Sequence, residues 1–130
     1  MMTEIAKANE KRILVVDDEK DLLVVLCELL QHYGFEAKGF TDSSEALKEF
    51  RKNSSLYSLV ITDLTMPGIQ GDELAQEVLR VRPGLPVMLC SGYNQRLDEV
   101  RAKQIGIHTI MNKPFEFEDL IKSVGAVLET

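Results

Sequence analysis

The chain has 130 residues, of which 45% are hydrophobic, and a formal net charge of −6 at pH 7. This length has room for one domain, and the hydrophobic content is that of a globular protein rather than a disordered one. The acidic charge argues against direct binding of nucleic acid, since contact with phosphates needs a basic surface. The sequence has no run of about 18 apolar residues that could span a membrane, and its charged start lacks the core of a signal peptide. We therefore expect a cytoplasmic protein.

Two cysteines, Cys27 and Cys90, each lie inside an apolar run. A disulfide or metal pair is typical of Cys-x-x-Cys spacing or of histidine neighbours, and neither pattern occurs. Both cysteines are therefore expected to be buried, reduced thiols that act as small hydrophobic side chains.

Short apolar runs alternate with longer amphipathic segments along the first half of the chain. Residues 13–16 are continuously apolar, which predicts a strand buried on both faces. Residues 21–33 carry leucines at helical spacing and are followed by Gly34, which favours the end of a helix. Residues 36–40 predict an edge strand, and the sequence 42–45 resembles a capping box that begins the next helix.

The second half of the chain repeats this alternation. The remaining predicted elements are the strands 58–62, 86–91 and 107–111 and the helices within 68–81, 94–105 and 117–128. The helix 94–105 is thinly apolar, with Leu97, Val100 and Ile105 among mostly charged and polar residues. Five successive strand–helix units predict an α/β fold, a doubly wound five-stranded parallel sheet with helices on both faces.

Polar residues close four of the predicted strands. Asp17 and Asp18 follow the first strand, Asp63 follows the third, Ser91 is the last residue of the fourth, and Lys113 comes two residues after the fifth. Aspartate and serine are common wherever a strand turns into a helix, so each residue alone has a purely structural explanation. Five such residues at one edge of a parallel sheet, where ligands usually bind, instead favour a shared site.

Three carboxylates at one sheet edge would repel one another unless cations neutralise them. Asp17 and Asp18 are hard oxygen ligands of the kind that suits Mg²⁺, and Asp63 completes the cluster. Carboxylates also serve as nucleophiles that form acyl phosphates, with Lys113 as a counter-charge and Ser91 as a hydroxyl donor to a phosphoryl oxygen. The cluster therefore predicts phosphoryl transfer, which depends mainly on positioning and charge neutralisation.

The pattern resembles the response-regulator receiver domains of two-component signalling. The matching blocks are residues 15–19, residues 63–68 with Gly71, residues 91–92 and residues 113–115. The resemblance implies a flavodoxin-like sheet with strand order 2-1-3-4-5, an N-terminal extension over residues 1–11 and a receiver domain over residues 12–129.

The resemblance also implies a role for each residue of the site. Asp63 matches the phosphoacceptor, and Ser91 and Lys113 match the hydroxyl and the lysine that reach the phosphoryl group. The Mg²⁺ ligands that it implies are Asp18, Asp63, the backbone carbonyl of Thr65 and, through a water molecule, Asp17. The peptide bond between Lys113 and Pro114 is expected to be cis.

The function implied is a phosphorylation-switched signalling domain rather than an enzyme, one that catalyses only its own phosphorylation and slow dephosphorylation. The donor would be a histidine kinase or a histidine phosphotransfer domain. The partner downstream would be an effector protein or the rest of a longer chain. The expected output face combines the helix 94–105, the strand 107–111 and the helix 117–128. The oligomeric state stays open, with a phosphorylation-dependent dimer among the alternatives.

One position departs from the family pattern. Ile110 occupies the place of the usual switch aromatic, three residues before Lys113, so coupling through a rotating ring is in doubt. Tyr93 beside Gly92 is an alternative aromatic, and we expect it to hinder the attack of water on the phosphorylated site.

Three other functions fit parts of the sequence. An aspartyl phosphohydrolase would need a second aspartate two residues after Asp63, where this chain has Thr65. A flavin-binding module would need a loop rich in glycine, serine and threonine, whereas the sequence 17–19 would repel a flavin phosphate. A receiver domain that no longer accepts phosphate is disfavoured by the complete set of site residues.

Overall fold

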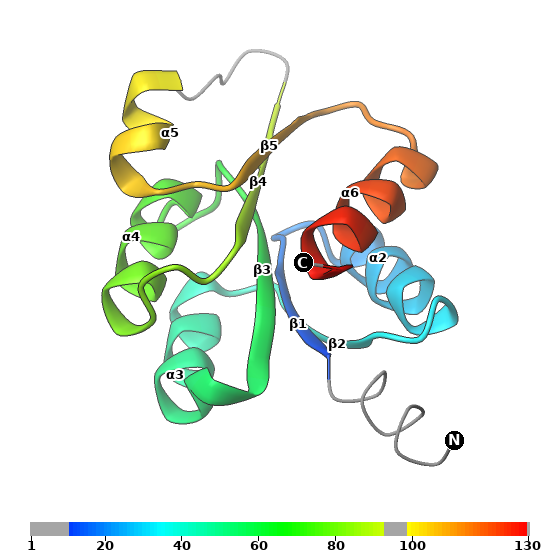
Figure 1. Ribbon diagram of the computed structural model, residues 1–130, viewed down its shortest axis with the longest axis horizontal. Coiled ribbons are helices and arrows are strands. Elements are labelled where there is room, and N and C mark those ends of the chain that lie inside the picture. Colours follow the sequence, from blue (N-terminus) through cyan, green and yellow to red (C-terminus); the bar gives the residue numbers. More distant parts are fainter. Residues whose placement is uncertain (1–10, 93–98, 130) are drawn as a thin grey trace.

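A five-stranded parallel sheet forms the centre of the chain in a computed structural model, which describes residues 11–92 and 99–129 (Figure 1). The strands are β1 (Arg12–Val16), β2 (Glu36–Phe40), β3 (Tyr57–Asp63), β4 (Val87–Ser91) and β5 (Thr109–Asn112). Their order across the sheet is β2-β1-β3-β4-β5, and each neighbouring pair is parallel. The predicted strand order is confirmed.

Helices cover both faces of this sheet. The helices are α2 (Lys20–His32), α3 (Ser43–Asn53), α4 (Gly71–Val81), α5 (Glu99–Ile105) and α6 (Phe117–Glu129), with a short 3₁₀ helix η1 (Ser54–Leu56) before β3. Figure 1 shows α2 and α6 on one face of the sheet and α3, α4 and α5 on the other. The five predicted helices are therefore confirmed, whereas η1 was not predicted. None of the helices described combines the length and the apolar character needed to cross a membrane.

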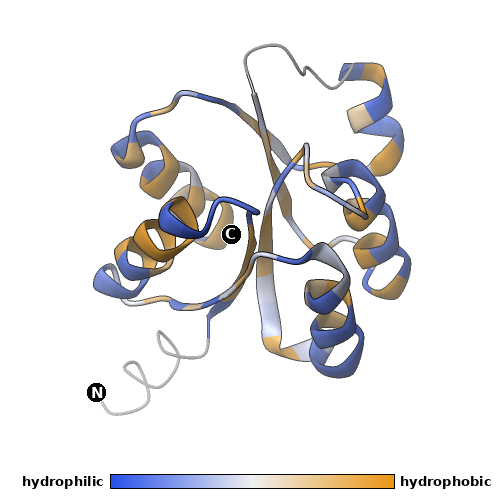
Figure 2. Cartoon of the chain, turned by 180° about the vertical axis from the view of Figure 1, so that it is seen from behind, coloured by the Kyte–Doolittle hydropathy of each residue, from blue (hydrophilic) through white to orange (hydrophobic). Residues whose placement is uncertain are grey.

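The two faces of β1 each contribute to a separate hydrophobic core. Ile13 and Val15 pack in the core beneath α2 and α6, and Leu14 and Val16 pack in the core beneath α3 and α4. All four side chains are at most 1% exposed. This is why the strand is continuously apolar: successive side chains point to opposite faces, and helices cover both. In Figure 2 the apolar colour is concentrated on the strands and the inward sides of the helices.

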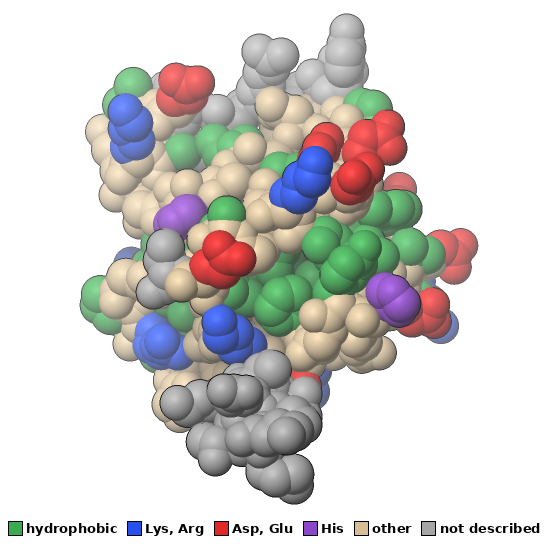
Figure 3. Space-filling model, turned by 45° about the vertical axis from the view of Figure 1, so that its right-hand side comes forward, with side chains coloured by type: hydrophobic (Ala, Val, Ile, Leu, Met, Phe, Trp, Pro, Cys, Tyr) green, Lys and Arg blue, Asp and Glu red, His purple; other side chains and the backbone are tan. Residues whose placement is uncertain are grey.

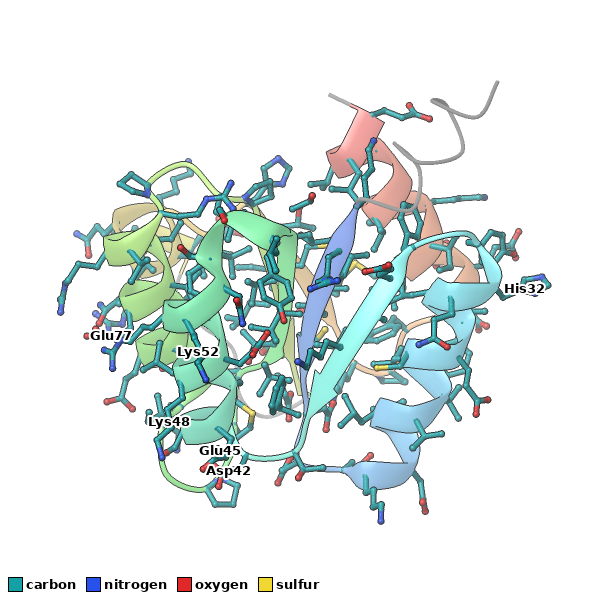
Figure 4. All side chains as sticks on the ribbon, turned by 90° about the horizontal axis from the view of Figure 1, so that it is seen from below. His32, Asp42, Glu45, Lys48, Lys52 and Glu77 are labelled. Atoms are coloured by element: carbon teal, nitrogen blue, oxygen red, sulfur yellow. The ribbon has the colours of Figure 1, made fainter. Side chains whose placement is uncertain are left out.

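The outer side of α3 is charged and faces solvent. Lys48 and Lys52 lie along it in Figure 4, and Lys48 pairs with Glu45 at 3.5 Å. The inner side of the same helix buries Ala46 and Phe50. This amphipathic pattern is what anchors the helix to the sheet.

The start of α3 differs from its prediction. The Asp42 carboxylate accepts a hydrogen bond from the Ser44 N–H at 2.8 Å, which caps the helix, but the described bonds do not include the reciprocal contact from Glu45. The complete capping box is at α4 instead, where the Gln70 N–H donates to the Glu73 carboxylate at 3.1 Å. Glutamine is a less common capping residue, so the pattern was missed.

One helix is described only in part, and one cysteine differs from its prediction. The predicted helix 94–105 is present as α5 from Glu99, but its expected beginning and Tyr93 lie outside the described residues. Cys27 and Cys90 are both free, and Cys90 is buried as expected. Cys27 is only half-buried, because it lies on the flank of α2 against Gly39 in the edge strand β2.

Candidate functional site

Three carboxylates meet at the carboxyl ends of β1 and β3. Asp17 is 3% exposed, Asp63 is half-buried and Asp18 is exposed. One oxygen from each lies within 4.8 Å of the others, a spacing at which they could hold one metal ion. The Asp17 backbone N–H donates to the Phe40 carbonyl at 3.1 Å, and its side chain accepts from the Glu19 N–H at 2.9 Å. These bonds fix the Asp17 side chain where β1 turns into α2.

Lys113 reaches this cluster from the segment that directly follows the edge strand β5. Its Nζ lies 3.2 Å from Asp17 Oδ2 and 3.3 Å from Asp63 Oδ1. Its backbone N–H donates to the Ser91 carbonyl at 2.7 Å, which ties the segment after β5 to the end of β4. The bond between Lys113 and Pro114 is cis, as expected. Lys113 therefore links the two aspartates that lie 96 and 50 residues before it in the sequence.

Ser91 and Thr65 flank Asp63. In the ladder between β3 and β4, Asp63 pairs with Cys90, and the Leu64 N–H donates to the Cys90 carbonyl at 2.8 Å. Ser91 is the next residue and is 1% exposed. Thr65 lies in the exposed loop two residues after Asp63. All the residues predicted for the site therefore lie at one end of the sheet.

Gly71 allows the beginning of α4 to approach the loop that carries Asp63. Its N–H donates to the Leu64 carbonyl at 2.7 Å. A Cβ at position 71 would lie 2.8 Å from Leu64 Cα and would collide with the Asp63 carbonyl. A side chain at position 71 would thus displace the loop, so the glycine in this motif has a packing reason.

Burial and neighbouring charges set the ionisation of the site. Burial raises the pKa of Asp63; Lys113 opposes this rise, and Asp17 adds to it, so the pKa lies above its ordinary value. Burial lowers the pKa of Lys113, but the charges of Asp17 and Asp63 outweigh that effect and raise it overall. Three carboxylates facing one ammonium leave an excess of negative charge on hard oxygen ligands, which suits a small divalent cation.

Cys90 contributes no charge to this end of the sheet. Burial raises the pKa of its thiol to about 12, and the charge of Lys113 only partly opposes that rise. The residue therefore stays a neutral thiol in the core beneath the site.

Sequence analysis missed an apolar pocket beside the cluster. It has a volume of about 370 Å³ and is lined by Leu22, Lys113, Pro114, Phe115 and Phe117. The only hint of this pocket in the sequence was the pair Phe115 and Phe117, which are separated by one acidic residue. The pocket depends on how α2 and α6 approach each other, which their separate patterns do not specify.

The sequence and the fold match those of a known family. The model of the family described as the response regulator receiver domain matches residues 13–125. The chain belongs to this family. The receiver domain is 34% identical over 116 residues to the sensory transduction protein RegX3 of Mycobacterium bovis, a match covering 89% of this chain and 50% of that protein. The chain thus spans about half the length of this relative.

Solved structures of receiver domains superpose closely on this one. A response regulator receiver domain protein from Clostridium thermocellum has a TM-score of 0.86 at 28% identity, covering 92% of this chain and 94% of that one. The response regulator TrrA from Thermotoga maritima, solved in complex with Mg(2+)-BeF, has a TM-score of 0.80 at 34% identity, covering 90% of this chain and 98% of that one.

Proposed function

We propose that this receiver domain is switched by phosphorylation of Asp63. The donor is a phosphohistidine on a histidine kinase or a histidine phosphotransfer domain. The observation that carries the proposal is the position of the Lys113 ammonium, within 3.3 Å of both Asp17 and Asp63. This arrangement pairs a nucleophile with a cation that can neutralise an incoming phosphoryl group.

The carboxylate cluster fits Mg²⁺ as the cofactor. In this proposal Asp18, Asp63 and the Thr65 backbone carbonyl bind the ion directly, and Asp17 holds it through a water molecule. Bound Mg²⁺ would neutralise charge on the phosphoryl oxygens during transfer. Support comes from the close approach of the three carboxylates and from the Mg(2+)-BeF complex of TrrA.

The residues of the chain have separate roles in the transfer. A carboxylate oxygen of Asp63 attacks phosphorus, so that an O–P bond forms while the N–P bond of the phosphohistidine breaks. The electron pair of the broken bond stays on the imidazole nitrogen, which takes up a proton. Lys113 pairs with the phosphoryl oxygens, and the Ser91 hydroxyl donates a hydrogen bond to one of them. Slow hydrolysis of the acyl phosphate returns the domain to its starting state.

The output face consists of α5, β5 and α6. Within the described helix α5, Ala102 is the only buried residue, and Val100 is 60% exposed. An ion pair at 3.4 Å joins Arg101 to Asp72 in α4. A helix with so little buried surface can shift at low cost when Ser91 and Lys113 move towards the phosphoryl group. Ile110 in β5 has no aromatic ring to rotate, so the signal passes through the strand and helix themselves.

We propose further that residues 12–129 act as the receiver domain and that residues 1–11 precede it as an extension. The downstream partner is an effector protein or the remaining part of a longer chain. The half-length match to RegX3 supports the second arrangement.

Labelling with acetyl phosphate in the presence of Mg²⁺ tests the proposal. Intact mass measurement should find one phosphoryl group on the wild-type chain and none on Asp63→Asn, because the amide cannot act as the nucleophile. An unlabelled wild type, or equal labelling of the two chains, would contradict the assignment of Asp63.

A further inference from the structure

The short helix α5 is attached to the rest of the fold by two contacts of different character. At its C-terminal end, Ile105 packs against the hydrophobic core beneath α3 and α4. Four residues earlier, the Arg101 guanidinium lies 3.4 Å from the carboxylate of Asp72 in the first turn of α4. Within the described helix only Ala102 is buried. One end of α5 is therefore held by apolar packing, and the part nearer its beginning is held mainly by an ion pair.

The exposed surface of α5 is mostly charged. Figure 3 shows exposed apolar side chains gathered towards α2 and α6, which lie on the other face of the sheet. Along α5 the exposed side chains include those of Glu99, Arg101 and Lys103. Since burial of apolar surface is the main force that holds a helix in place, a helix that buries so little depends more strongly on its charged contacts.

Asp72 is fixed relative to the phosphorylation site. It follows Gly71, whose N–H donates to the carbonyl of Leu64, the residue after Asp63, at 2.7 Å. The Asp72 side chain is 19% exposed, so its charge is partly shielded from water and attracts Arg101 more strongly than a fully exposed carboxylate would. The helix α4 is held to the sheet by its buried side chains, those of Leu74, Ala75 and Val78. Arg101 therefore pairs with a carboxylate that does not move with α5.

We propose that Asp72 and Arg101 form an ionic lock, which holds α5 against α4 in the unphosphorylated chain and opens when Asp63 is phosphorylated. The inference rests on the proposed function, because the phosphoryl group on Asp63 drives the opening. That group draws the Ser91 hydroxyl towards its oxygens, and Ser91 ends the strand that leads towards α5. The beginning of α5 then moves relative to Asp72, whereas the packed end at Ile105 acts as the pivot.

An ion pair that exists only before phosphorylation makes the domain harder to switch. Its free energy stabilises the unphosphorylated state alone, so it opposes the binding of any group that imitates the phosphoryl group. A partly exposed pair of this kind changes an equilibrium constant roughly two- to fivefold. Removal of either partner should therefore raise the affinity for such a mimic by the same factor.

Three variants of the full chain test the lock: Asp72→Asn, Arg101→Gln and the two substitutions together. The dissociation constant of beryllium fluoride, which imitates the phosphoryl group, is measured by NMR titration in saturating Mg²⁺. Arg101→Gln should bind it roughly two- to fivefold more tightly than the wild type. Loss of a positive charge would by itself weaken the binding of an anion, so tighter binding in this variant identifies the lock. The double variant should bind no more tightly than either single variant, because each has already broken the pair.

Arg80→Gln is the matched control, since Arg80 pairs with Glu77 at 2.8 Å within α4 and should bind the mimic as the wild type does. Hydrogen exchange gives a second measurement. Amides 99–105 should exchange roughly two- to fivefold faster in Arg101→Gln than in the wild type, and equally fast in both chains once beryllium fluoride and Mg²⁺ are bound.

Four outcomes would each overturn the inference: unchanged or weaker binding in Arg101→Gln, additive effects in the double variant, equal exchange without the mimic, or a difference in exchange that persists with it. Acetyl phosphate labelling separates the two proposals. Arg101→Gln should still be labelled on Asp63, whereas an unlabelled wild type would refute the phosphoacceptor role itself.

Discussion

Lys113 balances the charges of the site, so its removal should change the ionisation of Asp63. Since the Lys113 charge lowers the pKa of Asp63, Lys113→Met should raise that pKa further. Titration of the Asp63 carboxyl carbon by ¹³C NMR in metal-free buffer measures the change. Lys122→Met is the matched control, because Lys122 lies near Glu118 on α6. A pKa that is the same in Lys113→Met and wild type would contradict the role of Lys113.

The same pKa has a consequence for stability in metal-free buffer. Because burial raises the pKa of Asp63, the folded chain holds this proton more tightly than the unfolded chain does. Stability should therefore fall as pH rises from the ordinary pKa of a carboxyl group through the raised value. The total loss of stability should be larger in Lys113→Met, because the lysine charge no longer opposes the effect of burial on the pKa of Asp63.

Two glycines form a matched pair for testing the close approach of α4 to the Asp63 loop. Gly71→Ala should destabilise the chain by about 1–3 kcal/mol, because the added methyl group collides with the Asp63 backbone. Gly125→Ala should stabilise it by about 1 kcal/mol, because Gly125 lies inside α6 and, apart from the adjoining backbone of that helix, no atom of the described residues lies within 4 Å of the new Cβ. Urea denaturation measures both values. Equal effects at the two positions would show that the close approach of Gly71 to the Asp63 loop does not exclude a side chain.

At the scale of single elements, α5 is the helix expected to respond to phosphorylation. Its small buried surface predicts that beryllium fluoride with Mg²⁺ changes amide hydrogen exchange across residues 99–112. The helix α3 buries Ala46, Leu47 and Phe50 and should keep its protection unchanged, which makes it the internal control. Unchanged exchange across residues 99–112 would argue against this output face.

The elements also show what a sequence can predict. Strands such as β1 were predictable, because a short, continuous apolar run between two amphipathic helices is typical of a strand that is buried on both faces. The short helix η1 was not, since its structure depends on Arg82, which donates to the carbonyls of Ser54 and Tyr57 at 2.6 Å from 25 or more residues away. The sequence around η1 does not indicate a contact with a residue so far along the chain.

The site was predictable for a different reason. Asp17 directly follows β1, Asp63 is the last residue of β3 and Lys113 directly follows β5, and a parallel sheet places the carboxyl ends of its strands at one edge. Topology alone therefore brought them together. The pocket beside them was not predictable, because it requires the relative position of Leu22 on α2 and Phe117 on α6.

At the scale of the whole molecule, Mg²⁺ should stabilise the fold by relieving repulsion among the three carboxylates. At ten times its dissociation constant, the ion should raise the free energy of unfolding by about 1.4 kcal/mol. Thermal melts of the wild type with Mg²⁺ and with a chelator measure the effect. Asp18→Asn, a substitution at an exposed position, should lose most of it. An equal increase in stability with Mg²⁺ in the wild type and in Asp18→Asn would show that the ion binds elsewhere.

The lysine that completes the site directly follows β5, the last strand along the chain, whereas the acidic residues lie at the ends of β1 and β3. A chain that emerges from the ribosome in order, or one cut short before residue 113, possesses the carboxylates without their counter-charge. The carboxylates of Asp17 and Asp63 thus gain their counter-charge only when the segment that follows β5 has packed against the rest of the sheet.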